Sequence, residues 1–142
     1  MTKKIQIILV LSLVIMLTNN SAWALTDLER VSISDTKLVN AFGAPISELV
    51  NVNQQVQISA DIKNNQEKSQ KFVYIVQIKD ENDVVVSLGW ISGMLSPGQN
   101  LSPALSWSSK TAGTFTAEIF VWEGLINQNA LAEYTTFVIN TS

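Results

Sequence analysis

The chain has 142 residues, with 9 Lys and Arg against 12 Asp and Glu, a formal net charge of −3, and neither Cys nor His. This length allows one ordinary domain, and a charged fraction of 15%, against roughly 25% in typical soluble chains, disfavours a nucleic-acid binder. The lack of Cys and His excludes disulfides, thiolate nucleophiles, blue-copper sites and every catalytic arrangement that needs an imidazole base, so we expect a non-catalytic module with no cofactor.

The first 24 residues have the pattern of a secretory signal peptide. Lys3 and Lys4 precede an apolar run over Ile5–Leu17, and small residues at Ala22 and Ala24 match a signal-peptidase site. We expect cleavage after Ala24, which leaves residues 25–142 as one exported domain, secreted or at the cell surface. The alternative is an uncleaved anchor, which would need a longer apolar run to span a bilayer.

The remaining chain alternates apolar and polar residues at period two, with short turn signals between the alternating stretches. Asp80–Asp83 and Ser96–Gln99 have the composition of tight turns. The pattern predicts about seven strands in an all-β, two-sheet sandwich, with a barrel as the minor alternative. We place Val56–Lys63 and Leu101–Trp107 in one sheet. The strands expected in the other sheet are Phe72–Lys79, Val84–Ile91, Thr114–Trp122 and Leu131–Ile139. Two further extended segments are Val31–Val39 and Ile46–Val50.

Four segments of the chain carry a resemblance to a known family: Phe72–Asp80, Leu95–Gln99, Ser106–Trp107 and Ala112–Trp122. Together they resemble the Ig-like, fibronectin-III-like domains that are repeated in exported archaeal surface proteins. The resemblance implies an antiparallel Ig-like sandwich with an adhesion or scaffold role and no catalytic motif. The chain departs from this pattern because it has no inter-sheet Cys pair and carries Phe115 where many relatives have a corner Tyr.

Two kinds of polar motif are candidate sites. Asp80, Glu81 and Asp83 place three carboxylates within four residues, which makes the turn a weak Ca²⁺ candidate, but the longer EF-hand pattern is missing and an acidic hairpin turn is the simpler interpretation. Asn100 and Asn140 each begin an N-x-[ST] sequon and are glycosylation candidates, the first being better placed because it follows a turn.

Strand parity predicts an apolar binding patch on the outer face of the larger sheet. Phe72–Ile78 and Phe115–Val121 each turn alternate side chains to the core. The residues expected on the outer patch are Val73, Ile75, Phe120, Trp122 and Tyr134. Trp90 shares a face with Val84, Val86 and Leu88, so we expect it in the core. A folded-over loop or a reversed phase would abolish the patch.

The function favoured by the sequence is binding of a protein partner, or self-association, at the cell envelope. A contiguous apolar patch of a few hundred Å² is the size at which an interaction site becomes the better explanation. One alternative is a carbohydrate or small-molecule binder that uses exposed Trp, and another is an inhibitor or accessory subunit of an exported enzyme. We expect no nucleic-acid partner, and membrane contact only through an uncleaved signal.

Overall fold

A computed structural model describes residues 24–142, so the predicted signal peptide, apart from Ala24, lies outside the described residues. One short 3-10 helix, Asp27–Glu29, precedes nine strands. Among residues 24–142, no helix is long and apolar enough to cross a membrane. The strands are β1 (Val31–Val39), β2 (Leu49–Val50), β3 (Val56–Asn64), β4 (Gln70–Lys79), β5 (Val85–Leu95), β6 (Asn100–Leu101), β7 (Ala104–Trp107), β8 (Gly113–Trp122) and β9 (Thr135–Thr141).

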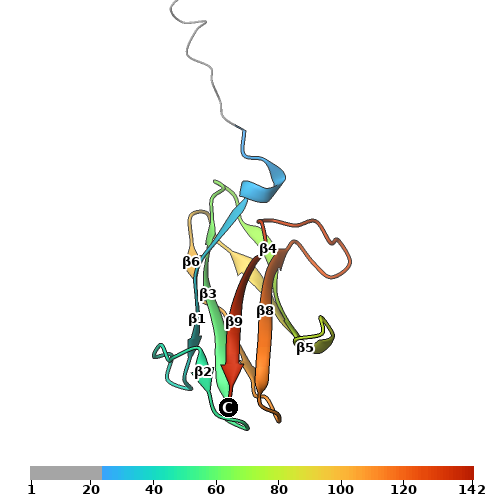
Figure 1. The fold of residues 1–142 in the computed structure, drawn as a ribbon. Coiled ribbons are helices and arrows are strands. Elements are labelled where there is room, and N and C mark those ends of the chain that lie inside the picture. Colours follow the sequence, from blue (N-terminus) through green and yellow to red (C-terminus); the bar gives the residue numbers. More distant parts are fainter. Residues whose placement is uncertain (1–23) are drawn as a thin grey trace, which may run out of the picture.

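The strands form two sheets that pack as a sandwich (Figure 1). In the smaller sheet β3 lies between β1 on one side and β6 and β7 on the other. The larger sheet has the order β2-β9-β8-β4-β5, and all its pairs are antiparallel except β2 with β9. The all-β sandwich is confirmed, and each strand expected in the two sheets lies in the sheet predicted for it.

The core fills the space between the inner faces of the two sheets because β3, β4 and β8 carry apolar residues at alternate positions. Tyr74 is fully buried, and its hydroxyl donates a 3.4 Å hydrogen bond to the carbonyl oxygen of Ile58 in the opposite sheet. Burial raises the pKa of the Tyr74 hydroxyl. At one end of the sandwich Trp107 meets Phe115 edge to face, with ring centroids 5.2 Å apart.

Several boundaries differ from those that the sequence predicts. The strand expected over Val84–Ile91 runs over Val85–Leu95. Pro103 divides the Leu101–Trp107 segment into β6 and β7, because proline cannot donate a ladder hydrogen bond. The last strand begins at Thr135 rather than Leu131, although Leu131 is still fully buried. β3 extends one residue beyond the predicted Lys63, to Asn64, which is buried.

Candidate functional site

The outer face of the larger sheet, meaning the face turned away from the core, is defined by strand pairing. Residues that pair directly across an antiparallel ladder point to the same side of a sheet. Val73 of β4 pairs with Trp122 of β8, and Ile75 pairs with Phe120. Tyr134 immediately precedes β9 and stacks on Phe120, with ring centroids 5.3 Å apart. All five residues expected on the outer patch therefore share one face.

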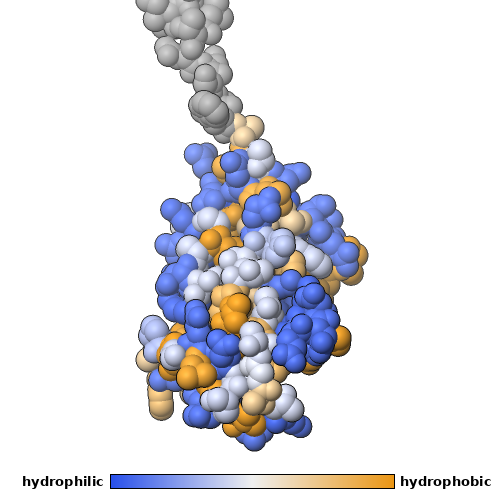
Figure 2. Space-filling model, in the orientation of Figure 1, coloured by the Kyte–Doolittle hydropathy of each residue, from blue (hydrophilic) through white to orange (hydrophobic). Residues whose placement is uncertain are grey.

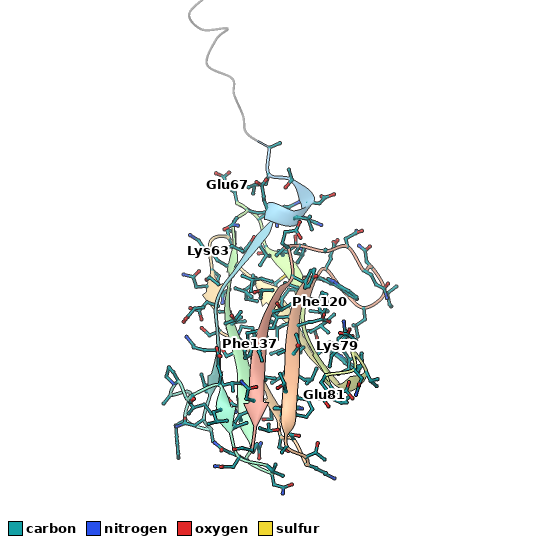
Figure 3. All side chains as sticks on the ribbon, in the orientation of Figure 1. Lys63, Glu67, Lys79, Glu81, Phe120 and Phe137 are labelled. Atoms are coloured by element: carbon teal, nitrogen blue, oxygen red, sulfur yellow. The ribbon has the colours of Figure 1, made fainter. Side chains whose placement is uncertain are left out.

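Accessibility divides these five residues into two groups. Val73 and Ile75 are only 4% and 6% exposed. Val73 pairs with Trp122 of β8, and Ile75 lies between Phe120 of β8 and Trp90 of β5, so larger aromatic side chains cover them. Phe120 and Trp122 are half-buried and Tyr134 is exposed. In Figure 3, Phe120 lies to the right of β8 and the core-packed Phe137 to its left. The patch offered to a partner is thus aromatic, with Val73 and Ile75 as its floor.

Trp90 belongs to this outer face, so its predicted place in the core is wrong. It pairs with Ile75, and its side chain is 52% exposed. The inner side of β5 carries Gly89 and Gly93, which pair with Val76 and Phe72. Because glycines occupy these core-facing positions, the large apolar residues of β5 do not mark the core side.

A groove of about 780 Å³ lies between β5 and the segment that follows β8. The residues that line it include Lys71, Val73, Trp90, Met94, Leu125 and Ile126. Figure 2 shows hydrophobic residues along the right-hand margin, where Figure 1 places β5 and this segment. Met94, Leu125 and Ile126 are not among the predicted site residues. The strand expected over Val84–Ile91 ends before Met94, and no strand periodicity extends into residues 123–130.

The segment 123–130 keeps a defined position beside the groove. Its two ends are joined by an isolated bridge between Trp122 and Ala130 and by a 2.9 Å hydrogen bond from the Glu123 amide to the Asn129 carbonyl. Arg30 donates a 3.3 Å hydrogen bond to the Ala130 carbonyl and lies 3.7 Å from the Glu123 carboxylate. These contacts hold the base of the segment, while Ile126 at its tip is fully exposed.

A polar cluster borders the aromatic patch toward the acidic turn. Glu118 accepts hydrogen bonds of 2.6 Å from Gln77 Nε2 and 2.9 Å from Lys79 Nζ. The bond to Glu118 raises the pKa of Lys79 above its ordinary value. These polar groups satisfy one another's hydrogen-bonding capacity. The part of the outer face that remains for a partner is therefore the aromatic patch.

The polar motifs of the sequence lie apart from the groove. Asp80 Oδ1 accepts hydrogen bonds of 2.9 and 3.0 Å from the amides of Asn82 and Val84, which assigns it a turn-stabilising role. In the described part of the chain, no three carboxylate, imidazole or thiol side chains are grouped to hold a metal ion, and this includes the turn of Asp80, Glu81 and Asp83. Asn100 and Asn140 are both exposed on strands. Asn140 Oδ1 accepts a 3.1 Å hydrogen bond from Thr114.

The fold resembles that of several solved proteins. The C-terminal domain of Wzt superposes with a TM-score of 0.65 at 13% identity, over 82% of this chain and 76% of that domain. The CARDB domain of the PF1109 protein from Pyrococcus furiosus, solved with di-metal ions, superposes with a TM-score of 0.53 at 17% identity, over 82% of this chain and 97% of that domain. The chain has an Ig-like β-sandwich fold. No protein-family model matches the sequence, and no curated protein matches it.

Other similar structures are glycosidases, but the match covers little of each enzyme. A β-glucosidase from Erythrobacter marinus superposes with a TM-score of 0.56 at 9% identity, over 79% of this chain and 15% of the enzyme. A β-glucosidase from Listeria innocua gives 0.53 at 13% identity, over 79% of this chain and 16% of the enzyme. At such identities the likeness shows the fold alone and carries no evidence of catalysis.

Proposed function

We propose that this protein is a non-catalytic, exported binding module of the kind found in surface proteins. It engages a protein partner, or a second copy of itself, through the outer face of its larger sheet. One observation carries this proposal: Trp90, Met94, Phe120, Trp122 and Tyr134 gather accessible apolar surface on one side of the molecule. Aromatic residues and Met are enriched in protein interfaces, where they supply most of the binding energy.

The chemistry available to the chain supports a non-catalytic role. The sequence holds no His and no Cys, and the one carboxylate in the middle of the outer face, Glu118, is already occupied by Gln77 and Lys79. A glycosidase needs two carboxyl groups at a set separation beside an enclosed sugar site. The lining of the groove offers Glu123 as its single carboxylate.

Carbohydrate binding is the second candidate, and the groove beside Trp90 favours it. The indole of Trp90 is half exposed at the groove, and Lys71, Ser92 and Asn127 supply polar groups along the same lining. A flat aromatic side chain flanked by hydrogen-bonding groups suits a ligand with apolar and polar faces. Titration of the purified protein with soluble glycans, followed by Trp emission, separates this candidate from protein binding.

The test of the leading proposal removes exposed apolar groups without opening the core. We expect the Trp90→Ser, Ile126→Ser double variant to lose at least about tenfold in retention on isolated cell envelopes, because both side chains line the groove. Sedimentation of purified protein with envelope material measures the retention. Unfolding in urea should change by less than about 1.5 kcal/mol, since both side chains are exposed.

Phe42→Ser is the matched control, because Phe42 is 95% exposed on the segment between β1 and β2 and does not line the groove. It should leave envelope retention unchanged. Equal retention of the wild type, the double variant and the control would overturn the proposed binding surface.

A further inference from the structure

The outer edge of β5 is long, apolar and without a partner strand. β5 runs over 11 residues and pairs with β4 on one side, and within residues 24–142 no strand pairs with its other side. An open edge presents a row of backbone amides and carbonyls that can hydrogen-bond to another strand. Most of its side chains are exposed as well. Figure 1 shows β5 at the margin of the larger sheet.

The other sheet edges are protected in ways that discourage pairing. β2, at the opposite edge of the larger sheet, has two residues. β1 is interrupted by a register shift between Ser34 and Lys37. At this shift Asp35 adopts a positive φ of 50°, and its carboxylate forms an ion pair with Lys37. β6 has two residues, and Pro103 directly precedes β7. Short strands, bulges, charges and prolines are the usual devices against edge-to-edge association. β5 has one register shift as well, between Val85 and Ser87 at its beginning, and its pairing with β4 is regular from Ser87 to Leu95.

β5 carries none of the charges that would repel a second copy. No Asp, Glu, Lys or Arg occurs from Val84 to Leu95. Large apolar side chains exposed along this stretch are Val84, Val85, Val86, Leu88, Trp90, Ile91 and Met94. Leu88, Trp90 and Met94 lie on the outer side of the strand, whereas Ile91 pairs with the core residue Tyr74. Because the stretch is neutral and mostly apolar, it can pair with a second copy of itself without charge repulsion.

We propose that two copies of this chain associate through antiparallel pairing of their β5 edges, around a two-fold axis at Gly89. This inference rests on the proposed function and identifies the partner as a second copy. In this register Leu88 of each copy lies opposite Trp90 of the other, so the two-fold axis creates that apolar pair twice. The two larger sheets become one continuous sheet, and their outer faces lie on the same side.

Charges at the two ends of β5 favour this register. Lys71 of β4 pairs with Met94 of β5, and Met94 lies opposite Val84 of the second copy, one residue from Asp83. Each Lys71 therefore comes within about two strand spacings, roughly 10 Å, of the acidic turn of the other copy, a distance that a lysine side chain largely spans. Lys71, Glu81 and Asp83 form no ion pair among the described residues. Two such attractions arise per dimer.

The first experiment measures self-association of purified full-length chain by sedimentation velocity. A specific interface of standard size covers about 800 Å² on each partner, and a single strand edge supplies less than that, so we expect a dissociation constant in the micromolar range. Leu88→Lys should weaken association at least about tenfold, because it places two lysines on a paired edge. Phe42→Lys, a charge of the same sign on a distant exposed site, should leave it unchanged.

The second experiment tests the register through charge and cross-linking. Lys71→Glu should weaken association about threefold to tenfold, and adding Glu81→Lys to it should restore association, because the attraction is rebuilt with reversed signs. Since the sequence has no Cys, a mixture of Leu88→Cys and Trp90→Cys chains should form a disulfide much faster than either variant alone.

A wild-type chain that stays monomeric to about 100 µM overturns the dimer, as does a dimer that Leu88→Lys leaves intact. Cross-linking that is equal in the mixture and in the single variants overturns the Gly89 register. If the chain is strictly monomeric but its retention on envelopes still depends on Trp90 and Ile126, the proposed binding function stands and the proposed dimer is wrong. Melting curves followed by circular dichroism check that each variant is folded.

Discussion

At the scale of single residues, Asn64 is a polar side chain that joins the two sheets. It is fully buried at the end of β3, and its Nδ2 group donates hydrogen bonds of 3.3 and 3.1 Å to the carbonyls of Leu95 and Ser96 at the end of β5. Its Oδ1 atom accepts a 3.1 Å bond from the Gln66 amide. A buried amide that meets several backbone groups at once is costly to replace, because those groups lose partners that water cannot supply.

We expect Asn64→Ala to lower the free energy of unfolding by about 1–3 kcal/mol, since the buried carbonyl of Leu95 loses its donor and a second bond, to the Lys68 carbonyl, is lost. Urea unfolding followed by Trp emission measures the change. Asn82→Ala is the matched control, because the Asn82 side chain is exposed in the acidic turn and makes no hydrogen bond to the described residues. Equal effects of the two substitutions would mean that Asn64 does not join the sheets.

At the scale of elements, β5 shows how a strand at the margin of a sandwich is adapted to its neighbours. Its inner side carries two glycines, Gly89 and Gly93, and the ring of Phe72 approaches Gly93 closely. A Cβ added at Gly93 would lie 2.9 Å from Cε1 of Phe72, whereas one added at Gly89 would meet Leu105 at an ordinary 3.6 Å. The ring of Phe72 is itself buried and has little freedom to move.

Gly93→Ala should therefore destabilise the protein by about 1–3 kcal/mol through overpacking against Phe72. Thermal or urea unfolding gives the value. Gly89→Ala, on the same side of the same strand, should change stability by less than about 1 kcal/mol, because the space at this position accepts a methyl group. A reversed order of these two effects would contradict the close approach of Phe72 to β5.

At the scale of the whole molecule, the predicted cleavage site leaves the described fold complete. Removal of residues 1–24 takes away none of the nine strands, because β1 begins at Val31. We expect the exported protein to begin at Leu25, and intact-mass measurement of the protein recovered from the cell surface or medium checks this. A species that retains Met1 would contradict the signal-peptide interpretation.

Two-residue periodicity and turn chemistry are local properties, and they are enough to predict the fold class of this chain. The alternation in Phe72–Ile78 and Phe115–Val121 identifies the core faces correctly, and the composition of the Ser96–Gln99 turn agrees with the positive φ of 67° at Gly98. From the same parity it follows that Val73, Ile75, Phe120 and Trp122 lie on one outer face, as the pairing of β4 with β8 confirms.

Only the tertiary structure decided which of these outer residues reach solvent. The alternation along a strand predicts which side of the sheet a residue lies on. Whether that side is covered depends on neighbours that are distant in the sequence. Val73 and Ile75 are buried beside Trp122 and Phe120, with which they pair, while Trp90 lies on the edge strand of the outer face and stays exposed. Burial of Asn64 is likewise non-local, since its partner carbonyl at Leu95 lies in the other sheet.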